Sequence, residues 1–380
     1  MSAGSTGALT VTLCRDPRQF AALEEPWNRL VRGCPTATPF QTHAWLHSWW
    51  LSYGRDGRLR VVLVRRGDEL VGAAALMLVH RPLPLLVPLG GGITDYFDVL
   101  LDARYADQVV PALAHGLHRA ARGAVVDLRE VRPGAAAERL YEQWPGARAR
   151  LADSTCMELP VLPFDELVKR MPKAGAQRVR AKLRKTDAAG IEEREVTEQE
   201  VPRAVRTLLR LHEKQWRGRG VTPEHLKPRF AEHLTRATRR MVRCGEGRLT
   251  EFRLEGKVVA ANVTLLSAGL SGGYLYGADP GLRDRKVDVA TLLLRHETGR
   301  ALAEGRPVVS FLRGSEPYKN HWRPEVVVNQ RFLLATGPLT PLLRLHESQV
   351  AGRERAVEVL RETLPAARDW RARLNDLRVR

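Results

Sequence analysis

Apolar positions in the first 130 residues follow two different periods. They recur three or four residues apart in 16–33 and 42–54, which predicts two helices. Apolar and polar positions then alternate in LRVVLVRRG (59–67) and ELVGAAALMLVH (69–80), which predicts a β-hairpin. The pattern continues with strand-like YFDVLLD (96–102), a helical segment over 105–122 and the apolar run AVVDL (124–128). This order predicts a mixed α/β unit of about 150 residues.

A similar order recurs from about Met157 onward. It comprises a basic helix (169–189), a short strand (191–196) and two helices (198–218 and 225–243), then three strands (248–256, 257–269 and 270–279), a helix (289–305) and a strand (307–312). Tight glycine-containing turns join the three strands, so we expect an antiparallel meander. The recurring order suggests a duplicated domain. The segment after Pro341 is predicted to be helical and basic.

The charge of the chain favours anionic partners. Lys and Arg total 61 against 43 Asp and Glu, a net charge of +18. Phosphates, nucleic acid or a membrane surface would suit this charge, although arginine spread along a chain rich in Ala, Gly and Pro is also what codon bias produces. Both interpretations stay open.

Cysteine spacing and hydropathy argue against several classes of protein. Four widely spaced cysteines without C-x-x-C argue against a zinc ribbon or a disulfide framework and favour a reducing cytoplasm. The most apolar stretch is interrupted by Arg81 and prolines, so we expect neither a membrane span nor export. P-loop, strand-linked G-x-G-x-x-G, G-x-S-x-G and H-E-x-x-H motifs do not occur, and we expect no metal.

A basic helix is the first candidate for binding. Eight Lys or Arg residues lie between Lys169 and Lys185 with no acid among them. Arg178, Lys182 and Lys185 share one helix face, while Val179 and Leu183 can face a core. Such a face is either solvated, or it contacts an anionic substrate or nucleic acid.

The second candidate is the start of the helix over 289–305, after a basic loop. A helix N-terminus has free N–H groups and the positive end of the dipole, which suits phosphates. Arg283, Arg285 and Lys286 would add positive charge there. Alternatively, Asp288 caps the helix and the cations are solvated.

The third candidate is SFLRGSEPYKNHW (310–322), in which functional side chains follow a predicted strand. Loops at the ends of rigid strands often carry function. Tyr318 could donate a proton, and Lys319 could neutralise an anion or polarise a carbonyl. Otherwise the tyrosine packs and the lysine lies in solvent.

Taken together, these segments resemble the GNAT-type acyltransferases, in particular the CelD/BcsL-like acetyltransferases related to the FemABX aminoacyl transferases. The resemblance is carried by the basic helix before Gly190, by LHEKQWRGRG (211–220), by YLYGADP (274–280) and by SFLRGSEPYKNHW. The chain departs from the family at Ser310, where Asp is common, and in the loop RDRKVDV, which lacks the usual glycines.

The resemblance implies tandem GNAT-like domains of the α/β (α+β) class, each with a mixed, mostly antiparallel sheet flanked by helices. Their expected bounds are 1–156 and 157–340, followed by a basic helical tail at 341–380. It also implies transfer of an acyl group, in the simplest case acetyl, from acyl-CoA to an amine in an interdomain cleft. The acceptor would be a small-molecule or saccharide amine.

Site roles follow from the same resemblance. The donor phosphates would contact Arg283, Arg285, Lys286, Val287 and Val289. Catalysis would use Tyr318 as acid and Lys319 as carbonyl or phosphate contact, with Glu316 as a candidate base that competes with Glu213 and His212. Substrate would contact Lys182, Arg184, Trp216 and Arg313.

Two alternatives remain beside this hypothesis. A FemABX-like transferase would take an aminoacyl group from tRNA, which suits the charge of +18. A non-catalytic GNAT scaffold would bind an anionic partner, with Ser310 and Asp288 as signs of a lost donor site.

Overall fold

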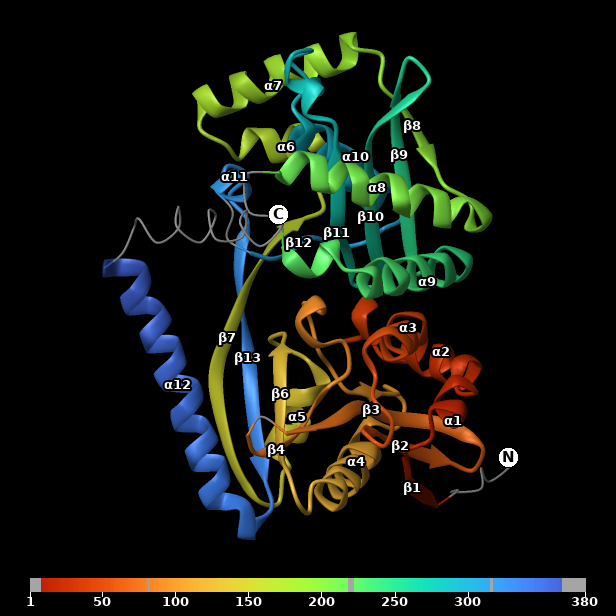
Figure 1. Ribbon diagram of the computed structural model, residues 1–380, viewed down its shortest axis with the longest axis vertical. Helices are drawn as coiled ribbons and strands as arrows, with labels where there is room; N and C mark the ends of the chain where they lie inside the picture. The colour runs from red at the N-terminus through yellow and green to blue at the C-terminus, as the bar shows by residue number, and fades with distance from the viewer. Residues whose placement is uncertain (1–7, 81, 218–221, 315–316, 364–380) are drawn as a thin grey trace, which may run out of the picture. The chain divides into compact units, whose positions relative to one another are not determined.

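The computed structural model describes residues 8–80, 82–217, 222–314 and 317–363, with the side chains of residues 317, 318, 354 and 357–363 left out (Figure 1). The chain divides into two compact units. Unit 1 comprises residues 1–156, 267–269 and 326–347, and unit 2 comprises residues 157–266, 270–325 and 348–380. Residues 326–347, which the sequence pattern assigns to the second domain and the tail, therefore belong to unit 1.

Unit 1 contains a mostly antiparallel sheet. Its strands follow the order β1-β2-β3-β4-β6-β13-β7, with β5 paired to β3, and β4 pairs with β6 in parallel. The elements are β1 (Leu9–Cys14), α1 (Pro17–Ala21), α2 (Glu24–Gly33), α3 (His43–Tyr53), β2 (Leu59–Arg66), β3 (Glu69–His80), β4 (Pro84–Pro88), β5 (Leu100–Leu101), α4 (Ala106–Ala120), β6 (Val125–Val131), α5 (Ala136–Glu142), β7 (Ala147–Pro160), β13 (Glu325–Ala335) and the first turns of α12 (Thr340–Thr363).

The core of unit 1 forms where α4 crosses β1, β2 and β3. Val109, Leu113 and Leu117 recur four residues apart on α4 and are fully buried. Gly72 on β3 makes room for this helix, because a Cβ there would lie 2.4 Å from Cγ1 of Val109. The predicted hairpin of β2 and β3 is confirmed, while the helix predicted over 16–33 is divided into α1 and α2.

A buried carboxylate caps α5 from another part of unit 1. The N-cap residue Ala135 has no side chain that can accept a hydrogen bond. Instead, Asp98 accepts the N–H groups of Ala136 and Ala137 at 3.0 and 2.8 Å. Burial raises the pKa of Asp98 to about 6, against the opposing hydrogen bonds from Thr36 and the backbone.

This raised pKa predicts a specific pH dependence. The folded protein holds the Asp98 proton more tightly than the unfolded chain, so its contribution to stability falls as pH rises through about 6. Relative to Asp98→Asn, the wild type should lose about 2 kcal/mol of unfolding free energy between pH 4 and pH 7. Urea unfolding of both proteins at the two pH values tests this. A constant difference would mean that the hydrogen bonds to the carboxylate offset its burial and leave the pKa unshifted.

The strands of unit 2 follow the order β12-β11-β10-β9-β8. Strands β8, β9 and β10 are antiparallel, β11 is next to β10, and β12 is parallel to β11. The elements are α6 (Phe164–Lys169), α7 (Lys173–Ala188), β8 (Glu192–Glu195), α8 (Val201–Trp216), α9 (Pro228–Cys244), β9 (Gly247–Leu254), β10 (Lys257–Ser267), β11 (Leu270–Ala278), α10 (Val289–Ala303), β12 (Val308–Arg313) and α11 (Pro317–Asn320). The predicted neighbours β9, β10 and β11 are thus confirmed, with β9 and β10 antiparallel.

Both units share one order of elements. In unit 1, strands β2, β3 and β4 are followed by α4 and by β6, which is parallel to β4. In unit 2, strands β9, β10 and β11 are followed by α10 and by β12, which is parallel to β11. Each parallel pair needs a crossover connection, and the helix supplies it. The expected class, tandem α/β units with mixed and mostly antiparallel sheets flanked by helices, is confirmed.

In the described part of the chain, none of the helices has an apolar run long enough to cross a bilayer. All four cysteines are free, and three of them are buried (Cys14, Cys34 and Cys156). Within the same residues, no group of three or more His, Cys, Asp or Glu side chains is arranged to hold a metal ion.

Candidate active site

The candidate site is built on the parallel strands β11 and β12. Ser271 pairs with Val309 and Gly272 with Ser310, and both strands continue beyond this register, β11 to Ala278 and β12 to Arg313. Because parallel strands end on the same edge of a sheet, the segments after them gather at one edge. The start of α10 and the chain that leads into α11 are these segments. The predicted residues 283–289 lie on the first, and Arg313 and Lys319 lie on the second.

The turn after β12 is held by side chain to backbone hydrogen bonds. Leu312 has a φ of 56° and Gly314 a φ of 110°, so the chain reverses through left-handed conformations. The hydroxyl of Ser310 accepts the Leu312 N–H at 3.1 Å and is buried. Ser310 therefore supports this turn, a role that an aspartate at the same position can also fill.

Lys319 also serves this turn. Its side chain is 3 % exposed, and its Nζ donates to the carbonyls of Phe311, Arg313 and Gly314 at 3.1, 3.0 and 3.2 Å. In this arrangement the ammonium group neutralises the ends of backbone dipoles. Glu316 lies outside the described residues, and so does the side chain of Tyr318, whose backbone is in α11.

Trp322 closes the predicted motif but belongs to the core. It is buried and its ring contacts that of Phe164 edge to face, with centroids 5.5 Å apart. Arg313 is half-buried at the end of β12. The motif therefore combines core residues, turn-forming residues and the segment that holds Tyr318.

The N-terminus of α10 is capped by Asp288, one of the two alternatives that the sequence left open. Asp288 accepts the Thr291 N–H at 2.9 Å and binds Nζ of Lys182 at 2.8 Å. Hydrogen bonds from Lys182 and Thr291 outweigh the effect of burial, so the pKa of Asp288 is lowered and the group is ionised at neutral pH. The pairing also places α7 against the start of α10.

The cations before α10 differ in their surroundings. Arg285 forms a bidentate pair with Glu255, with N–O distances of 2.7 and 3.2 Å, whereas Arg283 and Lys286 are exposed. Lys286 has a φ of 59°. Val287 packs in the core and donates its N–H to the Leu282 carbonyl, and Val289 is half-buried in the first turn of α10.

The basic helix α7 turns one face to the core of unit 2. Ala176, Val179 and Leu183 pack with residues of α6 and α10. The outward face carries the cations at 173, 178, 180, 182, 184 and 185, all exposed. Lys182 pairs with Asp288 and Arg184 is exposed, and their predicted contact with substrate stays a prediction.

The C-terminal half of α8 is attached to the end of β11 by three contacts. His212 Nδ1 lies 2.7 Å from the Tyr276 carbonyl, the Gln215 side chain accepts the Ala278 N–H at 3.0 Å, and Lys214 pairs with Asp279 at 2.9 Å. Gly277 allows this approach, because a Cβ there would lie 2.3 Å from the His212 backbone nitrogen. His212 is thus fixed at the carboxyl end of β11.

Sequence patterns did not find His225, which completes this cluster. Its Nδ1 lies 3.2 Å from Nε2 of His212, and its ring stacks on Phe230. Burial lowers the pKa of both histidines, that of His225 to about 4 with a further contribution from His212. Trp216 lies one turn after His212, half-buried, and among the described residues its indole N–H has no hydrogen-bond partner.

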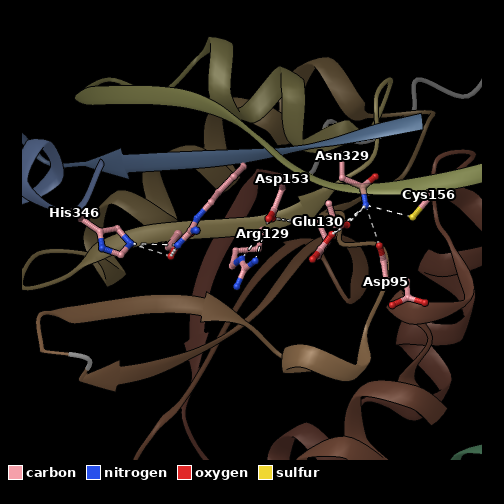
Figure 2. A network of polar contacts seen from close by, with 10 residues as sticks. Asp95, Arg129, Glu130, Asp153, Cys156, Asn329 and His346 are labelled. Atoms are coloured by element: carbon pink, nitrogen blue, oxygen red, sulfur yellow. Dashed lines mark hydrogen bonds and ion pairs between the residues drawn. The ribbon is translucent and has the colours of Figure 1, made fainter. Parts of the chain in front are cut away.

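Unit 1 has its own buried polar network, which the sequence does not predict (Figure 2). Asn329 Nδ2 donates to the Asp95 carbonyl and to Glu130, both at 3.1 Å, and it also contacts Cys156. Burial raises the pKa of the Cys156 thiol to about 12, so this cysteine stays protonated and is a poor nucleophile. The same network includes an ion pair between Arg331 and Asp127.

Comparisons with known proteins agree with this architecture. The family model of the acetyltransferase (GNAT) domain matches residues 173–320. FemX is similar in structure, with a TM-score of 0.60 and 12% identity over 88% of this chain and 99% of FemX. So are a conserved protein of unknown function from Bacteroides thetaiotaomicron (TM-score 0.55, 10% identity, 86% of this chain and 100% of that one) and L-PGS from Bacillus licheniformis (0.51, 11%, 87% and 96%). No curated protein sequence matches the chain.

At 10–12% identity these structural likenesses concern the fold. The match at 173–320 extends from α7 to α11 and therefore lies almost entirely in unit 2. Unit 2 thus contains the segment that matches the acetyltransferase (GNAT) domain, and the chain shares its fold with FemX.

Proposed function

We propose that unit 2 transfers an acyl group, in the simplest case acetyl, from acyl-CoA to a small-molecule or saccharide amine. The GNAT match at 173–320, which includes every predicted site residue, carries this proposal. The amine nitrogen bonds to the thioester carbonyl carbon as the C–S bond breaks. The site must then accept a proton from nitrogen, stabilise the oxyanion and protonate the thiolate. No covalent intermediate with the protein is required.

Charge pairing at the start of α10 supports a donor site there. Lys182 neutralises Asp288, and Glu255 neutralises Arg285. The positive end of the α10 dipole remains, with Arg283, Lys286 and the acid Asp284 exposed beside it. In the proposed site, Arg283, Lys286 and the backbone around Val289 contact the donor phosphates, and Arg285 and Val287 shape the loop.

The donor site is tested by thermal unfolding with acetyl-CoA and with free CoA. A ligand at about 100 times its dissociation constant adds roughly 2.7 kcal/mol, a shift of a few degrees. Lys286→Glu should weaken CoA binding at least tenfold, because it places a negative charge where a phosphate is expected. Arg206→Glu, an exposed cation on the first half of α8, is the matched control and should bind normally. Equal binding by both variants would rule out a phosphate contact at Lys286.

Tyr318 is the proposed acid that protonates the leaving thiolate. Tyr318→Phe should lower turnover about 10²-fold while leaving CoA binding unchanged, since it removes only the proton donor. Steady-state release of free thiol measures this. Tyr105→Phe in unit 1 serves as control. A loss below about threefold would exclude Tyr318 from this role.

Lys319 is proposed to act on the thioester carbonyl indirectly, by holding the turn after β12 in place. Glu316 remains a proposed base.

A second candidate function rests on α7. Its cations at 178, 180, 184 and 185 are exposed without an ion-pair partner among the described residues, and this face suits a polyanion such as aminoacyl-tRNA. Thermal shifts with bulk aminoacyl-tRNA at two salt concentrations distinguish the two donors. A shift with tRNA alone that collapses at high salt favours aminoacyl transfer. Silence from CoA and tRNA alike favours a non-catalytic scaffold.

A further inference from the structure

The cluster of His212 and His225 determines its own proton positions. A backbone carbonyl can only accept a hydrogen bond, so the 2.7 Å contact with Tyr276 requires a proton on Nδ1 of His212. Neutral His212 then has a bare Nε2, which must accept from Nδ1–H of His225 at 3.2 Å. The remaining ring nitrogen of this hydrogen-bonded pair, Nε2 of His225, therefore carries no proton and has a lone pair that can accept one.

The cluster of His212 and His225 is held at the sheet edge where the candidate active site lies. Three contacts join the end of α8 to the end of β11, and His212 is part of one of them. Strand β11 ends on the same edge of the sheet as β12, next to the turn that leads to Tyr318. His225 lies in a short turn over Pro223–Leu226, half-buried, with Phe230 stacked on its ring at 4.6 Å.

We infer that Nε2 of His225 accepts the proton that the acceptor amine loses, with His212 as the positioning residue behind it. This rests on the proposed acyl transfer. As the C–N bond forms and the C–S bond breaks, the proton leaving nitrogen moves to Nε2 of His225, while the thiolate takes a separate proton from Tyr318. The imidazolium is stabilised through His212 by the Tyr276 carbonyl, and it returns its proton to water after product leaves.

Both rings are neutral at neutral pH, which this role requires. Burial lowers the pKa of both rings, so the lone pair on Nε2 of His225 is not already protonated at pH 7, and an imidazolium formed during turnover releases its proton easily. Charged groups near the pair are themselves paired. They are Glu224 with Lys227 and Arg229, Glu213 with Arg217, and Lys214 with Asp279.

The tautomers are tested first, without any substrate. Two-bond ¹H–¹⁵N NMR spectra of the full chain at pH 7 should show a neutral Nδ1–H tautomer for both rings, assigned with His212→Gln and His225→Gln. A protonated ring, or an Nε2–H tautomer at either position, would overturn the inference.

The proton transfer is tested by kinetics with acetyl-CoA and the amines glucosamine, spermidine and hydroxylamine. His225→Ala should lower kcat/KM at least 10²-fold, with the CoA thermal shift retained, and added imidazole should restore at least tenfold. His212→Gln should lose less, about tenfold. His115→Ala, an exposed histidine of α4, is the control and should match the wild type.

The outcomes separate the inference from the proposed function. If the wild type transfers acetyl and His225→Ala keeps a third or more of kcat/KM, the proposed function stands and the inference fails. The inference also fails if His225→Ala binds CoA normally, loses activity and is not rescued by imidazole, because the histidine is then only structural. A wild type that neither binds CoA nor acetylates an amine overturns both.

Discussion

Gly277→Ala should destabilise unit 2 by about 3 kcal/mol or more. The new methyl group would lie 2.3 Å from the His212 backbone nitrogen and 2.5 Å from the Leu208 carbonyl oxygen. Both obstacles are helix backbone, which cannot turn aside as a side chain can, so α8 must move away from β11. We expect faster amide exchange in α8 and β11 and loss of the contact between His212 and Tyr276.

Gly273→Ala is the matched control for this prediction. It lies on the same strand, and a Cβ there meets no atom within 4 Å in the described structure. This substitution should be neutral or slightly stabilising, because alanine costs less backbone entropy than glycine in a strand. Hydrogen exchange and urea unfolding compare the two variants. Equal stability of Gly277→Ala and Gly273→Ala would show that α8 does not pack against β11 as described.

Asp127→Asn should cost unit 1 about 3–5 kcal/mol. Asp127 receives two hydrogen bonds from Arg331 at 2.7 and 2.5 Å and lies 3.0 Å from His346 Nε2, and all three residues are buried. Removing one charge of a buried pair leaves the other without compensation. The loss should appear in the unfolding of unit 1, which is followed by tryptophan fluorescence because Trp27, Trp45, Trp49, Trp50 and Trp144 all belong to it.

At acid pH, the difference in unfolding free energy between the wild type and Asp127→Asn should disappear. Burial raises the pKa of Asp127, but hydrogen bonds from His346 and Arg331 outweigh it, and the pKa is lowered. Its contribution is therefore present above the ordinary carboxyl pKa and is lost as pH falls through the folded value. Asp107→Asn, which removes an exposed pair with Arg139, should change stability by less than about 1 kcal/mol at pH 7. Comparable losses in the two variants would contradict a buried network.

Segments with strong local patterns were predicted well. Strands β9 and β10 are joined by a Glu255–Gly256 turn, as the sequence predicts, and α10 begins after Asp288, which caps it. These features depend on neighbours within a few residues, so period and turn chemistry suffice. The same holds for the hairpin of β2 and β3.

Strands β7 and β13 were not predicted, and their polar residues explain why. Asn329 and Arg331 interrupt the apolar run of β13 and would be expected at the surface. Both are buried because Glu130 and Asp127, 199 and 204 residues away, receive their hydrogen bonds. A hydrogen-bond partner that far away in the sequence cannot be recognised from local periodicity, so the sequence pattern did not predict β13 as a strand.

The candidate site likewise combines features that the sequence predicts with features that only the tertiary structure decides. By itself, the sequence determined the order of elements, the start of α10 near Asp288, the basic face of α7 and the segment that holds Tyr318, because each is a local pattern. Only the tertiary structure decided that Lys319 holds a turn, that Glu255 neutralises Arg285 and that His225 lies against His212. Such pairings depend on which residues packing brings within hydrogen-bond distance, and packing of α8 on β11 is a property of the whole unit.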